Sequence, residues 1–317
     1  MDISDMKVFV PNPIHQAAVD RLRSETGVVL WDDPAIGNWL DEADAIIVRT
    51  FQVRAPDIAR GKKLKAVGKH GIGVDAIDVA DARKAGIEVV YTPYENVESV
   101  AELAVSFMLA LSRNLWAGNK ALRAGEKLPP SEYVGIELVG KTLGIIGLGR
   151  IGRRVGSILT AAFGMKVVGF DPFLPEEAWK SMPFEVEKCD SVEELAARAD
   201  YATIHVPLTD ATRNLIGAKQ LAKFKPDAIL VNTSRGGIVD EEALYAALRD
   251  KQLRAAGSDV FVVEPPSADH PLLSLDNFMA MPHIGANTSD ALYRMGMTVA
   301  EDILRLLKGE KAVYYVP

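Results

Sequence analysis

The stretch Gly140-Lys-Thr-Leu-Gly-Ile-Ile-Gly-Leu-Gly-Arg-Ile-Gly152 joins an apolar strand pattern to three glycines spaced Gly-x-Gly-x-x-Gly. Gly147 permits a tight turn, Gly149 lets the backbone approach a pyrophosphate, and Gly152 lets the following helix pack closely on the strand. The N-terminus of that helix offers free N–H groups and a positive dipole end to an anion. The stretch therefore predicts a dinucleotide-binding βαβ unit.

An acidic residue further along strengthens this interpretation, because glycine is common and the glycine pattern alone is weak. Asp171 ends the next predicted strand, nineteen residues after Gly152. A carboxylate there can accept both ribose hydroxyls of NAD and would repel the additional phosphate of NADP. We therefore expect NAD as the cofactor. The alternative is a glycine-rich turn that only caps a helix.

Short apolar runs alternate with helical stretches along the whole chain, a pattern typical of parallel βαβ units. In the first half such runs begin at Val8, Ala45, Leu64 and Glu88, and after Lys141 six more alternate with helices. We expect an α/β protein with two doubly wound parallel-sheet domains, the second a Rossmann dinucleotide-binding domain. The segment from residue 99 to 116 is apolar almost all round, which predicts one long buried helix between the domains.

Composition and charge exclude several classes of protein. The 317 residues are 48% hydrophobic and 25% charged, as expected for a globular protein, and the net charge of −7 argues against general binding to nucleic acid or anionic membranes. No apolar run of about 18 residues predicts a membrane span. Cys189 is the only cysteine, which rules out an internal disulfide and a cysteine-based zinc site. We expect no metal ion and a cytoplasmic location.

Three ionisable residues follow predicted strands late in the chain: Arg235, Glu264 and His283. Ligands of open α/β sheets bind at the carboxyl ends of the strands, so these side chains can converge there. Histidine can take or give a proton near neutral pH, a carboxylate partner orients it, and arginine grips a carboxylate in two bonds. Singly, each is more often structural or a surface charge. Together they fit a site for a 2-hydroxy acid.

The motifs resemble those of the D-isomer-specific 2-hydroxyacid dehydrogenase family. Its signature segments correspond to residues 140–152, 205–208 (HVPL), 232–240 (NTSRGGIVD) and 282–285 (PHIG), and the resemblance covers nearly the whole chain. It implies that Arg235, Glu264 and His283 are the catalytic trio of an NAD-dependent enzyme that interconverts small 2-hydroxy and 2-keto acids.

The resemblance also implies a domain organisation and a set of cofactor contacts. Residues 1–98 and 287–317 would form a discontinuous substrate domain, with the NAD-binding domain, residues 99–286, inserted between them. The protein would be a homodimer, and the interdomain crevice would close on its substrate. The residues implied to line the cofactor are Gly147, Leu148, Gly149, Arg150, Ile151, Gly152, Asp171, Pro172, His205, Val206, Pro207, Thr212, Thr233, Ser234, Arg235, Asp259, His283 and Gly285.

The substrate contacts are expected in the first domain, apart from Arg235. Similarity to phosphoglycerate dehydrogenases within the family places Arg49, Lys69 and Asn96 near the far end of the substrate. Such donors suit a polar or anionic distal group, and phosphoglycerate is one candidate; the alternative is that Arg49 and Lys69 are surface charges. The expected substrate residues are Arg49, Lys69, His70, Gly71, Ile72, Gly73, Asn96 and Arg235.

Two other functions compete with this interpretation: an NAD-binding regulator, and another NAD enzyme on a related fold, such as an alanine dehydrogenase, whose motifs would differ at Arg235 and Glu264. Transcriptional corepressors resemble the family and keep the trio, so an NAD-binding regulatory protein without physiological turnover is the main alternative. Formate dehydrogenases also resemble the family, but they pair the histidine with glutamine, and Glu264 argues against that activity. Turnover of any 2-keto acid would separate an enzyme from a regulator.

Overall fold

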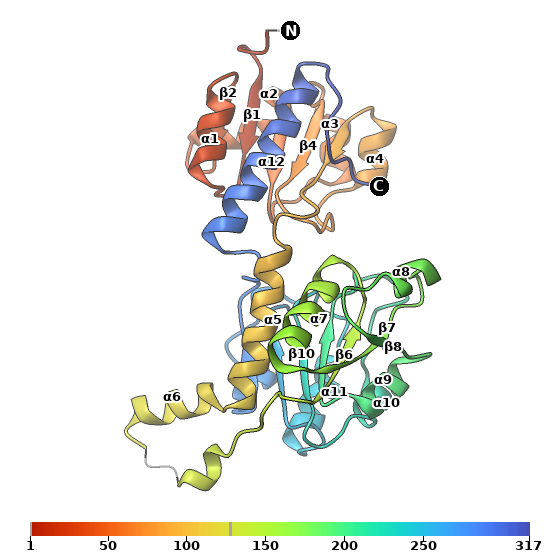
Figure 1. Ribbon diagram of the computed structural model, residues 1–317. Helices are drawn as coiled ribbons and strands as arrows, with labels where there is room; N and C mark the ends of the chain where they lie inside the picture. The colour runs from red at the N-terminus through yellow and green to blue at the C-terminus, as the bar shows by residue number, and fades with distance from the viewer. Residues whose placement is uncertain (1, 127–128) are drawn as a thin grey trace. The chain divides into compact units, whose positions relative to one another are not determined.

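The computed structural model describes residues 2–126 and 129–317, which form two compact units. Unit 1 consists of Met1–Asn96 with Ala286–Pro317, and unit 2 of Val97–Gly285. The domain boundaries expected from the sequence differ from these by at most two residues. Both ends of the chain lie in unit 1 (Figure 1).

In the described part of the chain, unit 1 contains a five-stranded parallel sheet with the order β2-β1-β3-β4-β5. This is a doubly wound order with its topological switch point between β1 and β3. Strands β3 and β4 are buried along their whole length, which explains the continuous apolar sequence of β3 and the absence of polar side chains from β4 before Lys69. The strands are β1 (Lys7–Val10), β2 (Gly27–Leu30), β3 (Ala45–Val48), β4 (Ala66–Lys69) and β5 (Glu88–Val90).

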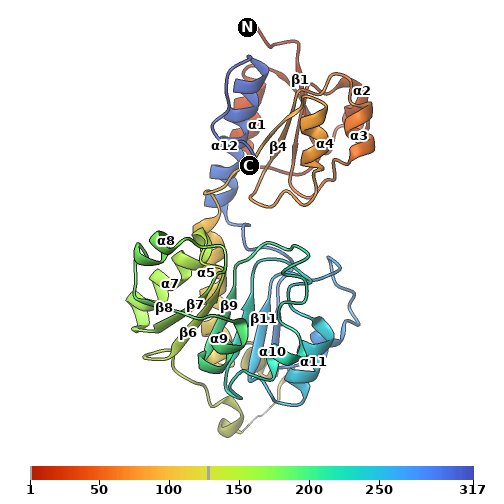
Figure 2. The ribbon, with the colours of Figure 1, turned by 90° about the vertical axis from the view of Figure 1, so that its right-hand side faces the viewer.

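Helices cover both faces of this sheet (Figure 2). Val8 and Ile47 pack toward α1 (Gln16–Arg23) and α12, whereas Phe9 and Ile46 pack on the opposite face. That face is covered by η1 (Pro34–Asn38), α2 (Trp39–Glu42), α3 (Ala55–Arg60) and α4 (Val79–Lys84).

The last helix, α12 (Ser289–Leu307), completes the core of unit 1 although it comes from the far end of the chain. A Cβ built on Gly68 of β4 would lie 2.6 Å from Val299 Cγ2, so glycine is what lets the helix approach the strand. The helix ends at Leu307, just before Gly309, as the sequence predicts.

The described residues of unit 2 form a seven-stranded parallel sheet with the order β12-β11-β10-β9-β6-β7-β8. Counted from β6, this is the Rossmann order with one further strand, and its switch point lies between β6 and β9. The strands are β6 (Thr142–Ile146), β7 (Lys166–Phe170), β8 (Val186–Lys188), β9 (Tyr201–Ile204), β10 (Ile229–Asn232), β11 (Ala255–Ser258) and β12 (Phe278–Ala280).

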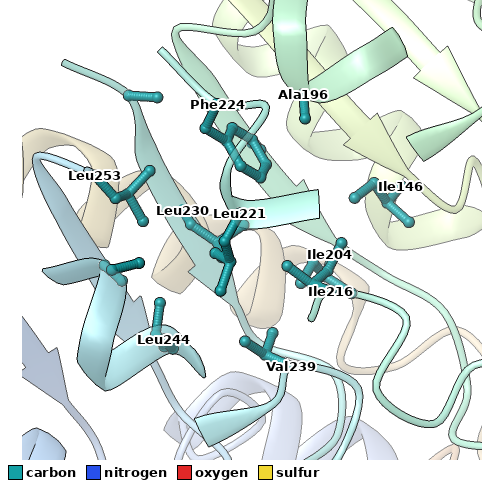
Figure 3. Close-up of a cluster of buried hydrophobic side chains, with 14 of the residues drawn as sticks. Ile146, Ala196, Ile204, Ile216, Leu221, Phe224, Leu230, Val239, Leu244 and Leu253 are labelled. Carbon is teal, nitrogen blue, oxygen red and sulfur yellow. The ribbon is translucent and has the colours of Figure 1, made fainter. Parts of the chain in front are cut away.

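Two clusters of buried side chains fill the two faces of this sheet. Figure 3 shows one of them, in which Leu221, Phe224 and Leu244 meet Ile204 and Leu230 of the central strands. The helices of unit 2 are α5 (Val97–Ser112), α6 (Leu115–Ala124), η2 (Pro130–Tyr133), α7 (Arg150–Phe163), α8 (Glu176–Lys180), α9 (Val192–Arg198), α10 (Ala218–Leu221), α11 (Glu241–Arg249) and η3 (Pro271–Ser274).

The structure corrects the prediction of one helix from residue 99 to 116. Helix α5 ends at Ser112, and a new helix begins at Leu115 after Asn114 adopts a left-handed conformation with φ 51°. Helix α5 packs on the sheet of unit 2, where Phe107 fills the space above Gly257 of β11. Its exposed side carries Glu98 and other polar residues.

None of the helices in the described ranges has the length and apolar character needed to cross a bilayer.

Candidate active site

Each of the three glycines in the predicted phosphate loop occupies a position where a side chain would interfere, for a different reason at each position. Gly147 has φ 90°, and a Cβ on it would lie 2.7 Å from the carbonyl oxygen of His205. A Cβ on Gly152 would lie 2.2 Å from the oxygen of Gly147. Gly149, which caps helix α7, has no atom within 4 Å of its Cβ position. The open space in front of a helix N-terminus fits a bound phosphate group.

Asp171 lies directly after β7 and is tied to this loop. Its Oδ2 accepts the N–H of Leu148 at 3.0 Å, and its Oδ1 accepts the N–H of Phe173 at 3.1 Å. Carboxylate oxygens have further lone pairs, so Asp171 can still accept hydroxyl groups of a ribose. Pro172 and Phe173 are exposed beside it, and the Phe173 side chain is 84% accessible.

The predicted contacts after β9 and β10 lie across the switch point from the glycine loop. Burial lowers the pKa of His205 to about 3, so this ring is neutral, and its Nε2 lies 2.9 Å from Thr203 Oγ1. Val206 contacts the loop at Gly147, and Thr212 Oγ1 donates to the carbonyl of Pro207 at 2.6 Å. Among the described residues, His205 Nδ1 and Thr233 Oγ1 are buried polar atoms without a hydrogen-bond partner.

His283 and Glu264 are joined by a 2.7 Å hydrogen bond between Nδ1 and Oε2. The other carboxylate oxygen of Glu264 accepts the N–H of Phe261 at 3.0 Å. Burial raises the pKa of Glu264, but the His283 hydrogen bond, the Phe261 N–H and the charges of His283 and Arg235 outweigh it, so the pKa lies below its usual value. The carboxylate form, which favours a positively charged imidazole, is therefore preferred.

Asp259 fixes the backbone that carries the histidine. It is 1% exposed, and its two carboxylate oxygens accept the N–H groups of Ile284 at 2.8 Å and Gly285 at 2.7 Å. Its carbonyl oxygen accepts the N–H of His283 at 2.8 Å. Burial raises the pKa of Asp259, and these backbone donors only partly offset it. The anchoring explains how His283 can hold φ 55°, an uncommon value outside glycine.

Arg235 is set by Asn232, the last residue of β10, which the sequence analysis did not single out. Asn232 Nδ2 donates to the carbonyl of Arg235 at 2.9 Å, while its Oδ1 accepts from the Ser234 N–H at 3.1 Å. Next to the arginine, a Cβ on Gly236 would lie 1.9 Å from the carbonyl oxygen of Phe261. The loop of Arg235 and the loop of Glu264 are therefore in direct backbone contact.

The candidate substrate residues of unit 1 gather after β3 and β4. Arg49 follows β3, and burial lowers its pKa. Lys69 is 9% exposed and donates to the carbonyl of Arg49, so it is not the surface charge that the alternative interpretation expected. Asn12, which the sequence analysis missed, accepts the N–H groups of Arg49, Thr50 and Phe51 at 3.0, 3.1 and 3.0 Å.

The described part of unit 1 also contains buried polar atoms without hydrogen-bond partners. His70 is 3% exposed with both ring nitrogens unbonded, and burial, followed by the nearby charge of Arg49, lowers its pKa to about 4. Asn96 is 7% exposed, and its Oδ1 has no partner. The loop continues through Gly71, at φ 141°, to Ile72 and Gly73, both half-buried. Unpaired buried polar groups cost free energy unless a ligand satisfies them.

No group of three or more His, Cys, Asp or Glu residues suited to a metal ion is present in residues 2–126 and 129–317. The candidate functional groups of unit 2 are a phosphate loop and an acid–base pair beside an arginine. Those of unit 1 are buried or partly buried cations and amides.

Comparisons with known proteins agree with this geometry. Residues 105–285 match the family model of the D-isomer specific 2-hydroxyacid dehydrogenase, NAD binding domain. The chain is 45% identical over 315 residues to D-3-phosphoglycerate dehydrogenase of Methanocaldococcus jannaschii, covering 97% of this chain and 58% of that protein. It is 44% identical over 271 residues to hydroxypyruvate reductase of Thermotoga maritima, covering 84% of this chain and 86% of that protein.

Among solved structures, the TT0316 protein of Thermus thermophilus superimposes with a TM-score of 0.89 at 34% identity, covering 98% of this chain and all of that one. The chain spans little more than half the length of the phosphoglycerate dehydrogenases that it matches, at 58% for two archaeal ones.

Gly236→Ala tests the contact between the loop of Arg235 and the loop of Glu264. The added methyl group has no room against the Phe261 carbonyl, so we expect an overpacking cost of about 1–3 kcal/mol in the free energy of unfolding. Urea unfolding measures it, with Gly37→Ala as control because no atom lies within 4 Å of its Cβ position. Equal stability of the two variants would contradict the proposed contact.

Proposed function

This chain belongs to the D-isomer specific 2-hydroxyacid dehydrogenase family, and we propose that it interconverts a small 2-hydroxy acid and its 2-keto acid with NAD. The observation that carries this proposal is the 2.7 Å bond between His283 Nδ1 and Glu264 Oε2, with Arg235 close enough to lower the carboxyl pKa. A general acid–base, its orienting carboxylate and a fixed cation are the groups that this reaction requires. They stand at the carboxyl edge of a Rossmann sheet.

His283 is the proposed acid–base. Because Nδ1 is engaged by Glu264, Nε2 is the ring nitrogen left for the substrate oxygen. NAD, when bound, accepts or supplies the hydride at C2. During oxidation Nε2 takes the hydroxyl proton, and during reduction it returns a proton to the keto oxygen. Glu264 stabilises the imidazolium, which forms when Nε2 takes the proton during oxidation and which supplies the proton during reduction.

Arg235 is the proposed grip on the substrate carboxylate. Its guanidinium can form two parallel bonds that fix C2, and its backbone is held by Asn232. Lysine could not reproduce this geometry, because it offers a single point charge.

The cofactor residues fit NAD on structural grounds. The open space at Gly149 and the N-terminus of α7 suit the pyrophosphate, and Asp171 suits the adenosine ribose. The unpartnered Thr233 Oγ1 and His205 Nδ1 lie at the carboxyl ends of β10 and β9, where a nicotinamide would be held. We propose the full set of predicted residues from Gly147 to Gly285 as the cofactor contacts.

The distal end of the substrate is proposed to be polar or anionic. Lys69 is buried and Arg49 is partly buried, and burial lowers the pKa of Arg49, so an anionic group beside these two cations would offset the cost of burying their charge, which an aliphatic group would not do. Phosphoglycerate meets this requirement, and it is the substrate named for the archaeal relative.

We also propose that the protein is a cytoplasmic homodimer. Helix α6 supports the dimer, because Leu115, Trp116 and Leu122 expose 59, 47 and 79% of their surface. Three large apolar side chains exposed on one short helix are suited to a subunit interface. The single buried thiol, Cys189, suits a reducing compartment.

Cofactor choice gives the first test of this function. We expect a strong preference for NAD over NADP, and Asp171→Asn should narrow it, because an amide removes the charge while an oxygen remains for the Leu148 N–H. Asp227→Ala, which removes an exposed carboxylate in the same unit, should leave the ratio of kcat/KM values unchanged. Equal kcat/KM values with NAD and NADP in the unaltered protein would contradict the proposed role of Asp171.

Proton transfer gives the second test. His283→Ala should lower kcat by a factor on the order of 10²–10⁴, the usual loss for a missing general acid–base. Reduction needs protonated His283, so its rate should fall as pH rises, and Glu264→Gln should move that fall to lower pH by removing the charge that stabilises the imidazolium. Initial rates of NADH oxidation across pH measure both effects. Full activity in His283→Ala would show that another group transfers the proton.

The substrate gives the third test, by comparison of phosphohydroxypyruvate, hydroxypyruvate and 2-ketoisocaproate. Arg49→Ala should raise KM for the phosphorylated acid on the order of 10- to 100-fold, the loss of a charge-assisted bond, and change KM for pyruvate little. Arg60→Ala, on the exposed side of α3, is the matched control. A highest kcat/KM with 2-ketoisocaproate would contradict a polar distal pocket.

A further inference from the structure

We propose that Glu241 and His270 form a positioning pair that holds the Glu264 loop, and through it the orientation of His283. The inference rests on the proposed function, since it assigns a role within that acid–base site. The side-chain partners of Glu241 are the Val262 N–H and the His270 ring. The pair acts on the short segment between β11 and Glu264, residues 259–264.

The two residues that precede Glu264 in this segment bury little of their side-chain surface. Val262 and Val263 expose 61 and 71% of their surface, so apolar burial does not fix them. The Val262 N–H instead donates to Glu241 Oε1 at 2.8 Å. One residue earlier, the Phe261 N–H donates to Glu264 itself. Two consecutive backbone donors thus link Glu241 to Glu264.

Glu241 is held in turn by His270. Its Oε2 lies 3.2 Å from His270 Nε2, and the two side chains are only 21 and 20% exposed. The His270 ring also packs edge-on against Phe261, with ring centroids 5.5 Å apart. The histidine therefore restrains the loop twice, through the carboxylate and through the aromatic ring.

Helix capping does not account for this arrangement. Glu241 is the first residue of α11, where an acidic side chain commonly interacts with the helix N-terminus. Here the preceding residue, Asp240, caps the helix by accepting the Ala243 N–H at 3.0 Å. Both oxygens of Glu241 face groups outside the helix, the Val262 N–H and the His270 ring.

The consequence is a connected chain of bonds from α11 to the acid–base. Glu241 accepts the Val262 N–H, and the neighbouring Phe261 N–H donates to one oxygen of Glu264. The other oxygen of Glu264 bonds to His283 Nδ1. Loss of the first bond should let the carboxylate turn away from the imidazole while Arg235, held by Asn232, keeps its place. The expected signature is a defect in proton transfer rather than in substrate binding.

The test uses Glu241→Ala, Glu241→Gln and His270→Ala, with Glu242→Ala as the matched control on the exposed side of the same helical turn. Steady-state kcat and KM for 2-keto acid reduction are measured across pH in each variant. The ¹⁵N shifts of the His283 ring, which report its tautomer, are measured without substrate. Urea unfolding confirms that each variant is folded.

Glu241→Ala should lower kcat on the order of 10- to 100-fold, the cost of a small displacement of a catalytic group. Its pH profile should move to lower pH as in Glu264→Gln, its KM should change little, and the His283 ring should lose its preference for a proton on Nδ1. Glu241→Gln keeps an oxygen for Val262 and should restore most of kcat. His270→Ala should show the same pattern more weakly.

A wild-type pH profile and wild-type ring signals in Glu241→Ala and His270→Ala would overturn the positioning pair. A fall in stability with an unshifted profile would reduce the pair to a structural role and overturn it equally. Absence of turnover in the unaltered protein would instead reject the proposed function, while the ring signals would still decide whether the pair positions His283.

Discussion

The parallel direction of the strands is the constraint on which the rest of this structure depends. When neighbouring strands run the same way, all their carboxyl ends meet at one edge, and the loops that leave that edge are brought together without any specific attraction between them. In unit 2 this edge gathers the glycine loop after β6, His205 after β9, Arg235 after β10 and Asp259 after β11. In unit 1 it gathers Arg49 after β3 and His70 after β4.

Convergence alone leaves loops free to move, and here side-chain acceptors remove that freedom. Asn12, Asn232, Asp259 and Glu241 each accept a backbone N–H in a loop that carries a candidate functional residue. Asn12 and Asp259 accept from consecutive residues, which fixes the direction of the chain as well as its position. Such bonds stabilise the irregular backbone that catalytic geometry requires. Gly236 serves the same end by allowing two of these loops to touch.

Local features of the sequence predicted most of this arrangement. The glycine spacing, the following Asp171 and the three ionisable residues after strands are near-neighbour patterns, and the structure places each in the segment that follows its expected strand. Strands β2 and β8 were missed because one is half-exposed and the other, Val-Glu-Lys, is a three-residue edge strand with little apolar pattern. The break after Ser112 was missed because it depends on Asn114 adopting a left-handed conformation.

The partners of the loops could not be predicted, because they depend on contacts between residues far apart in the sequence. His270 belongs to none of the sequence motifs, yet its ring bonds to Glu241, twenty-nine residues earlier. Nothing in either local sequence specifies that pairing.

The contribution of α12 to unit 1 has a consequence for synthesis on the ribosome. Unit 2 is complete in the chain at Gly285, whereas the core of unit 1 needs Val299, Ile303 and Leu307 from the last helix. The inserted unit can therefore fold during translation. Until α12 has been synthesised, the strands of unit 1 remain uncovered on the face around Gly68. During that interval the nascent chain presents an open apolar sheet, the kind of surface that chaperones bind.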